Sequence, residues 1–299
     1  TVVNPGPGGG TSDGATFTIN NPAPTLGSLS PARVPLGGAA FTLAVTGTGF
    51  VDGSVVRWAG DDRPTSLVSG TRLEASIPAS DLLATGEIAV TVFNPGPGGG
   101  SSAALTVTIF GPPTITAQPA DQEIADGSSA TLTVEAEGEE PLSYQWYIGA
   151  SGDDSSPIAG ATAASLTVTP SASSSYWVRV SNAAGSVDSD AATVRLIGAP
   201  EITGQPASQA IFLGQTATLT VTATGEGLTY QWYEGGSGDT STPIAGATGP
   251  SLTTPALTAT TSYWVQVTNS VGTSANSDAA TVTVHGPPAI VAQPASQAI

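Results

Sequence analysis

Apolar residues recur at every second position over short stretches of this chain, which is the period of a strand with one buried face. Five such stretches lie in residues 22–110, with clusters of Gly, Pro, Asp and Ser between them. They are centred on Leu43, Val56, Ala75, Val90 and Val107. A 3.6-residue period long enough for a helix is absent, apart from a single turn at residues 79–84. The pattern predicts an all-β chain.

Short motifs repeat along the chain at intervals of 86 to 90 residues. NPGPGGG occurs at residues 4–10 and 94–100, and YQWY occurs at residues 144–147 and 230–233. A repeat of this length is too long for a solenoid unit and has the size of a whole β-sandwich domain. The repeats therefore predict three complete modules and two partial ones. The complete modules are residues 22–110, 112–197 and 199–285, with the end of a preceding module at 1–20 and the first strand of a following module at 287–299.

The predicted modules are joined by short hinges that contain one glycine and one or two prolines. They are Gly111–Pro113, Gly198–Pro200 and Gly286–Pro288. Proline fixes its own φ and restricts the residue before it, so such hinges are stiff. Compact modules on stiff hinges predict a rod-like string. The partial modules predict either a window on a longer repetitive chain or completion of their strands by neighbouring copies at sheet edges.

Residues 22–110 resemble the IPT/TIG domain. The resemblance rests on LSP at 29–31, GG at 37–38, VTGTGF at 45–50, VVRWAG at 55–60 and IP at 77–78. It implies an immunoglobulin-like sandwich with a connecting role. DNA-binding members of the family rely on basic loops, and this module lacks them.

Residues 112–197 and 199–285 resemble the immunoglobulin-like domains found in tandem in large bacterial surface proteins. They share the pattern GxxATLTVxAxG, then YQWY, then SYWVxVxN. The resemblance implies that Trp146 and Trp232 are the buried core tryptophans and that Tyr176 and Tyr263 form the tyrosine corner. It also implies that valine pairs replace the family's cross-sheet disulfide. These pairs are Val134 with Val178 and Val221 with Val265.

The composition narrows the class of protein. The 299 residues include no cysteine, methionine or lysine, and six arginines stand against 23 acidic residues, for a formal charge of −17. Scattered arginines cannot form the basic stripe that nucleic acid or an anionic membrane surface requires. No apolar run is long enough to span a bilayer. An acidic, lysine-free chain rich in Thr and Ser favours an extracellular or cell-surface location.

The sequence contains few residue combinations that could carry out catalysis. The single histidine, His285, occupies a hinge position, so neither a catalytic triad nor a histidine-based zinc site can be assembled. Adjacent carboxylates at 61–62, 139–140 and 153–154 fall in polar loops, and neighbours on an extended chain point to opposite faces. We therefore predict a protein that is not an enzyme and needs no cofactor.

Two binding hypotheses stay open. Calcium takes six to eight oxygen ligands, and Asp188, Asp190 and Asp278 are the candidates near the hinges. If Trp146 is buried, strand alternation turns Tyr147 outward, and Tyr233 occupies the equivalent position. These two tyrosines are then available to contact a glycan or a host-surface protein.

The leading functional hypothesis is a non-catalytic structural segment of a bacterial extracellular fibre, stalk or surface layer. Its partners are copies of itself or neighbouring modules of the same long chain. The first alternative is an adhesin that binds glycan or protein through exposed loops. The second is the non-catalytic arm of a secreted hydrolase.

Overall fold

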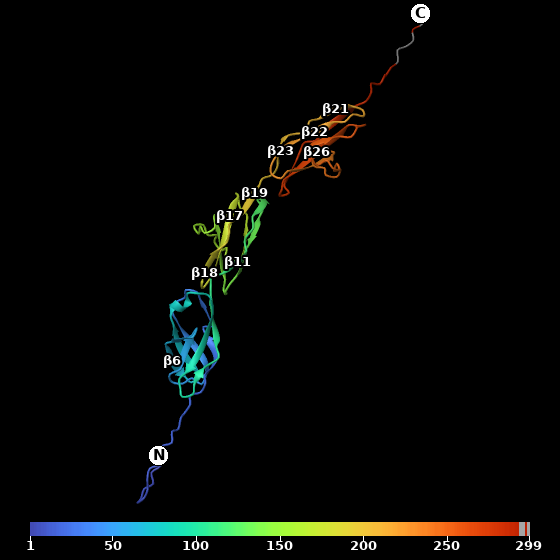
Figure 1. Cartoon of the computed structure of the whole chain (residues 1–299). Coiled ribbons are helices and arrows are strands. Elements are labelled where there is room, and N and C mark those ends of the chain that lie inside the picture. Colours follow the sequence, from blue (N-terminus) through green and yellow to red (C-terminus); the bar gives the residue numbers. More distant parts are fainter. Residues whose placement is uncertain (293–296, 298–299) are drawn as a thin grey trace.

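The computed structural model describes residues 1–292 and 297, in which three β-sandwiches follow one another along a rod (Figure 1). Among these residues the only helical element is the 3-10 turn η1 (Ala79–Leu82), where the sequence predicts a single turn. The predicted all-β fold class of tandem sandwiches is confirmed. No helix in the described part of the chain is long and apolar enough to cross a membrane.

Module 1 (residues 22–110) consists of two sheets packed face to face. The first has the strand order β1 (Thr25–Ser30), β3 (Phe41–Thr48), β7 (Arg72–Ile77), β6 (Thr65–Ser69). The second has the order β2 (Arg33–Pro35), β10 (Leu105–Phe110), β8 (Gly86–Asn94), β4 (Val55–Trp58), β5 (Asp61–Arg63), with β9 (Gly100–Ser101) beside β8. The five predicted strands are β3, β4, β7, β8 and β10. Their inward residues fill one core that includes Leu43, Val45, Leu73, Val90 and Val107.

Module 2 (residues 112–197) has one larger sheet and two strand pairs opposite it. The larger sheet has the order β12 (Gln122–Ala125), β19 (Ala192–Ile197), β17 (Ser174–Asn182), β15 (Ser143–Ile148), with β18 (Gly185–Asp188) beside β17. The pairs are β11 (Thr114–Ala117) with β14 (Glu135–Glu137), and β13 (Ala130–Thr133) with β16 (Ser165–Val168). Strand β12 runs parallel to β19, and the other pairs are antiparallel.

Module 3 (residues 199–285) repeats this topology. Its larger sheet has the order β21 (Gln209–Phe212), β28 (Ala280–His285), β26 (Thr261–Thr268), β24 (Thr229–Glu234), with β27 (Ser274–Asn276) beside β26. The opposite pairs are β20 (Glu201–Gly204) with β23 (Thr222–Thr224), and β22 (Thr218–Thr220) with β25 (Ser251–Thr253). Each module has its own hydrophobic core, so each can be perturbed separately.

The described residues on either side of the three modules carry little regular structure. Residues 1–20 extend away from module 1 and include one isolated bridge between Val3 and Thr11 (Figure 1). The side chains of Phe17 and Ile19 are 86% and 76% exposed. Residues 287–292 contain no strand, and residues 293–296 and 298–299 lie outside the described residues. The predicted first strand of a following module, residues 287–299, therefore lies only partly within the described residues.

Candidate functional sites on the sheet faces and at the module junctions

The residues assigned to the Ig-like cores by resemblance all lie in the interior. Trp146 and Trp232 are fully buried, and their indole N–H groups donate to the carbonyls of Ala163 and Gly249, each at 2.9 Å. Burial, the largest cause, raises the pKa of Tyr263 above its ordinary value of 10.0. The other buried members of the set are Tyr176, Val134, Val178, Val221 and Val265. These residues hold the two sheets together and offer no surface to a ligand.

Tyr147 and Tyr233 lie on the outer face of the larger sheets, but neither ring is free. The Tyr147 ring stacks on Trp177 with centroids 4.4 Å apart, and Tyr233 stacks on Trp264 at 4.6 Å. Both tyrosines are half-buried and both tryptophans are fully buried. One face of each tyrosine ring is thus already occupied, which reduces the surface that the glycan hypothesis requires.

Trp177 and Trp264 lie on the same outer sheet face, and the sequence analysis did not single them out. Each stands between two inward residues, as Trp177 does between Tyr176 and Val178, so alternation places it on the outer face. An exposed tryptophan is expected there, yet neither is exposed. In module 3 the Trp264 N–H donates to the Asp239 carbonyl at 3.2 Å, in the loop that follows β24. A tryptophan in an outward position, opposite the second tyrosine of YQWY, is the signal of such a covering loop.

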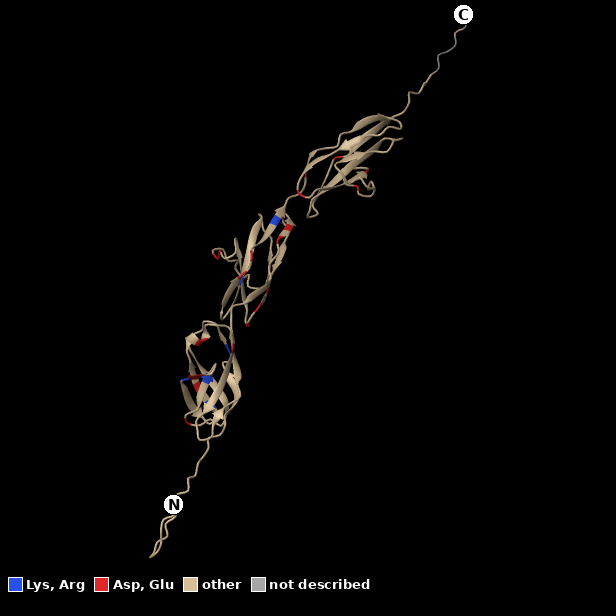
Figure 2. Cartoon of the chain, in the orientation of Figure 1, with Lys and Arg blue, Asp and Glu red and all other residues tan. Residues whose placement is uncertain are grey.

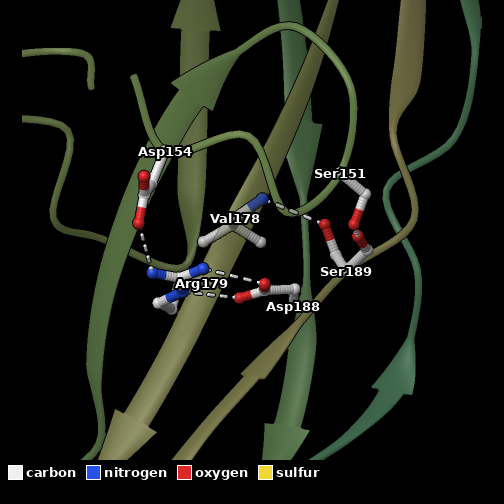
Figure 3. Close-up of polar contacts among 6 residues, drawn as sticks. All are labelled: Ser151, Asp154, Val178, Arg179, Asp188 and Ser189. Carbon is white, nitrogen blue, oxygen red and sulfur yellow. Dashed lines mark hydrogen bonds and ion pairs between the residues drawn. The ribbon is translucent and has the colours of Figure 1, made fainter. Parts of the chain in front are cut away.

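Three charged side chains meet on the outer face of module 2 (Figure 3). Arg179 donates to both oxygens of Asp188 at 2.7 and 2.9 Å, and to Asp154 at 3.1 Å. The guanidinium lies 5.3 Å from the Trp177 ring centroid, within cation–π range. The hydrogen bond that Arg179 donates to Asp188 is the main cause that raises the pKa of Arg179 further above its ordinary value. In module 3 the neutral pair Gln266 and Asn276 occupies the corresponding place, 3.2 Å apart.

The three candidate calcium ligands are not brought together. Asp188 is held by Arg179, while Asp190 is exposed and uses its backbone N–H to bond the Gln118 side chain at 2.9 Å. Asp278 repeats the contact of Asp190 in the next module, with Gln205. Within the described residues there is no group of three acidic, His or Cys side chains placed to hold a metal ion.

A buried serine stands between the candidate aspartates in each Ig-like module. Ser189 separates β18 from β19, and its hydroxyl accepts a hydrogen bond from the Val178 backbone N–H at 2.9 Å (Figure 3). The same hydroxyl donates to the Asp190 carbonyl at 2.8 Å. Ser277 makes the equivalent bonds to Val265 and Asp278. The motif read as a cation site is therefore a strand bulge in which a side chain replaces one ladder hydrogen bond.

Ion pairs cross both junctions between modules. Arg33 of module 1 pairs with Glu139 of module 2. Arg195 of module 2 pairs with Glu226 of module 3 and also with Glu123 of its own module, at 2.7 Å. Figure 2 shows basic and acidic positions meeting where module 2 joins module 3. Glu139 and Glu226 occupy equivalent places, each directly after a glycine, so the two Ig-like modules present the same carboxylate to the module before them.

Comparison with known protein families assigns each module. The IPT/TIG domain family matches residues 24–109, the immunoglobulin domain family matches 112–182, and the family described as Ig-like domain CHU_C associated matches 198–286. The chain is an IPT/TIG domain followed by tandem Ig-like domains. Strings of such modules are structural or binding segments, and both resemblances noted in the sequence are confirmed.

Individual relatives add a context for the string. Residues of this chain are 36% identical over 176 positions to Endoglucanase C of Cellulomonas fimi, a match that covers 56% of this chain and 16% of that protein. The three N-terminal domains of the outer capsid protein Hoc of bacteriophage RB49 align over 89% of this chain and 99% of theirs, with a TM-score of 0.56 and 14% identity. The titin I-band fragment I67–I69 aligns over 89% of this chain and 98% of its own, with a TM-score of 0.38 and 14% identity. The Hoc alignment shows the shared fold alone.

Proposed function

We propose that this segment is a non-catalytic spacer arm of a secreted, multidomain protein. The observation that carries the proposal is that both junctions are short and bridged by side chains from the two modules that meet there. Only residues 111–113 separate β10 from β11, and only residues 198–200 separate β19 from β20. A spacer acts by keeping its two ends apart, and short bridged junctions serve that purpose.

The stiffness comes from the linkers more than from the ion pairs. Exposed ion pairs contribute about 0.2–1 kcal/mol each, too little to hold two modules in place alone. Proline at 112, 113 and 200 removes backbone freedom from linkers that are three residues long. The pairs Arg33–Glu139 and Arg195–Glu226 then select one orientation from the few that remain.

The relatives favour an accessory arm over the other functional alternatives. One relative is named as an endoglucanase, and the matched stretch is a minor part of it. This supports the hypothesis of a non-catalytic arm of a secreted hydrolase and an extracellular location. Binding of a glycan or protein through Tyr147 and Tyr233 loses support because both rings are partly covered by tryptophan. Assembly of copies into a fibre stays a prediction, which light scattering at rising protein concentration tests.

The test is a distance measurement between modules. Because the chain has no cysteine, cysteines introduced in pairs accept spin labels without competing thiols. The positions are Ser76, Thr133 and Thr220, one exposed strand residue in each module. Pulsed electron–electron resonance is expected to give one narrow distance distribution for each junction. Distributions as broad as those of a flexible linker refute the spacer function.

Charge-neutralising variants sharpen the test. Arg195→Gln removes the ion pair across the second junction and is expected to broaden the Thr133–Thr220 distribution while leaving Ser76–Thr133 unchanged. Arg72→Gln is the matched control, because Arg72 pairs with Glu74 inside one strand of module 1. Equal effects of the two variants exclude a role for the junction pair.

A further inference from the structure

Each module carries an asparagine at the same point of its fold, where the strand that pairs with the last strand ends. Asn94 ends β8, Asn182 ends β17, and Asn269 directly follows β26. The side-chain amide of each donates a hydrogen bond to a backbone carbonyl where the chain enters its own module, which is the first residue of module 1 and the preceding linker for modules 2 and 3. The acceptors are Pro22 at 2.9 Å, Gly111 at 3.0 Å and Gly198 at 2.8 Å.

The other end of each asparagine side chain is held inside the module. The Asn182 oxygen accepts from the Ala184 backbone N–H at 2.9 Å, and the Asn269 oxygen accepts from the Thr273 N–H at 2.8 Å. In module 1 the Asn94 oxygen accepts from the Ser54 hydroxyl at 2.7 Å. With the oxygen committed to a donor, the amide nitrogen points away from it, toward the entering chain. The same nitrogen also donates inside the module, to the Gly49 carbonyl at 2.6 Å in Asn94 and to the Glu139 carbonyl at 3.4 Å in Asn182.

We propose that these three asparagines form one common joint that clamps the incoming chain to each module. The inference rests on the proposed spacer function and names how that function is achieved. Since the amide binds a backbone carbonyl, the contact does not depend on which residue supplies that carbonyl. An IPT/TIG module and an Ig-like module therefore use the same joint, and modules of either kind can follow one another in a rigid string.

The NPGPGGG loop extends this joint in the IPT/TIG module. The Asn21 backbone N–H donates to the Pro97 carbonyl, and the Gly99 N–H donates to the Asn21 carbonyl, both at 2.7 Å. A Cβ on Gly98 would lie 2.7 Å from the Asn21 carbonyl oxygen, and Gly98 and Gly99 have φ of +75° and +72°. The glycine run at residues 98–100 thus leaves room for the backbone of the linker, which is a binding role within the joint.

The joint is tested with Asn182→Asp and Asn269→Asp in the spin-labelled chain. Aspartate keeps the oxygen that caps the turn and loses the donor that reaches the linker. Asn182→Asp is expected to broaden the Ser76–Thr133 distribution and spare Thr133–Thr220, and Asn269→Asp is expected to do the reverse. Loss of a single hydrogen bond of this kind corresponds to a fall on the order of threefold to tenfold in the ratio of clamped to released joints.

Asn276→Asp is the matched control, because Asn276 is an exposed asparagine of β27 that hydrogen-bonds the Gln266 side chain rather than a linker, and it receives the same added charge. The thermal midpoint of each variant is measured alongside, since a role confined to module stability moves the midpoint and not the distance distribution. A narrow wild-type distribution that neither joint variant broadens overturns the clamp and leaves the spacer function intact. A wild-type distribution that is already broad overturns both.

Discussion

Replacement of Ser189 by alanine removes one hydroxyl from the bulge between β18 and β19. Ser189 is 1% exposed, and its hydroxyl is the acceptor for the backbone N–H of the fully buried Val178. It is also the donor to the Asp190 carbonyl. Alanine preserves the size of the site closely, so the change isolates two hydrogen bonds without opening a large cavity.

The cost follows from the group that is left behind. A buried N–H without a partner costs about 1–3 kcal/mol, more than the roughly 1 kcal/mol net value of an exposed hydrogen bond. The Asp190 carbonyl adds little, because Asp190 is exposed and water replaces the lost donor. We expect module 2 to lose about 2 kcal/mol of unfolding free energy. For a module of this size that is a fall in melting temperature of about 8–16 °C.

Hydrogen exchange read by mass spectrometry assigns the loss to one module, which a whole-chain melt cannot do. Protection of the core strands of module 2, such as β15 and β17, is expected to fall by about 30-fold in the Ser189→Ala protein. Modules 1 and 3 keep their protection because their cores are separate. Ser277→Ala is expected to produce the same loss in module 3 alone.

Ser186→Ala is the control for this prediction, because Ser186 is an exposed serine of the neighbouring strand β18. It changes the same chemical group at a site where water satisfies the backbone. If Ser189→Ala costs no more than Ser186→Ala, the hydroxyl does not replace a ladder hydrogen bond. If modules 2 and 3 both lose protection in the single variant, their cores are not independent.

Three further outcomes are expected. Trp264→Phe is expected to destabilise module 3 by about 0.5–1.5 kcal/mol more than Trp177→Phe destabilises module 2, because only Trp264 loses a hydrogen bond. The buried Trp177 N–H has no partner among the described residues, and equal shifts of the two denaturant midpoints refute this. Hydrogen bonds from Ser155 hold the pKa of Asp153 below its ordinary value of 3.8, so their contribution to stability is present above pH 3.8 and is lost as the pH falls through the lowered pKa. Ser155→Ala is expected to raise the pKa of Asp153 in an NMR titration. A calcium chelator is expected to leave the melting temperature unchanged, and a lower melting temperature with chelator would support the calcium hypothesis.

Local patterns along the chain were sufficient for much of the fold. The alternation around Leu43 and Val107 marks strands because successive side chains point to opposite faces of a sheet. The interior positions of Trp146 and Val178 are implied by the resemblance to Ig-like domains, on motifs that recur 86 and 87 residues further along the chain. These inferences succeed because each needs only neighbouring residues or a comparison of one module with the next.

The outer sheet face shows where alternation stops being informative. It places Trp177 outward, which is correct, but exposure also depends on what covers that face. The loop after β15 reaches across the sheet, and its Asp154 bonds Arg179 from the strand beside it. Asp188 looked like an oxygen ligand for a cation until that arginine was seen to occupy both of its oxygens. Strand alternation cannot predict contacts between a loop and a strand that are distant in sequence, because it depends only on neighbouring residues.

The sequence alone determined that this protein is a string of β-sandwich modules on short hinges, because module length, strand period and hinge composition are all local properties. Only the tertiary structure decided what joins the modules. Asn182 meets the carbonyl of Gly111, and Asn269 meets that of Gly198, across 71 residues in each case. Arg195 meets Glu226 from the neighbouring module. Such contacts exist only once each module has folded and brought the end of one strand back beside the linker where that module began.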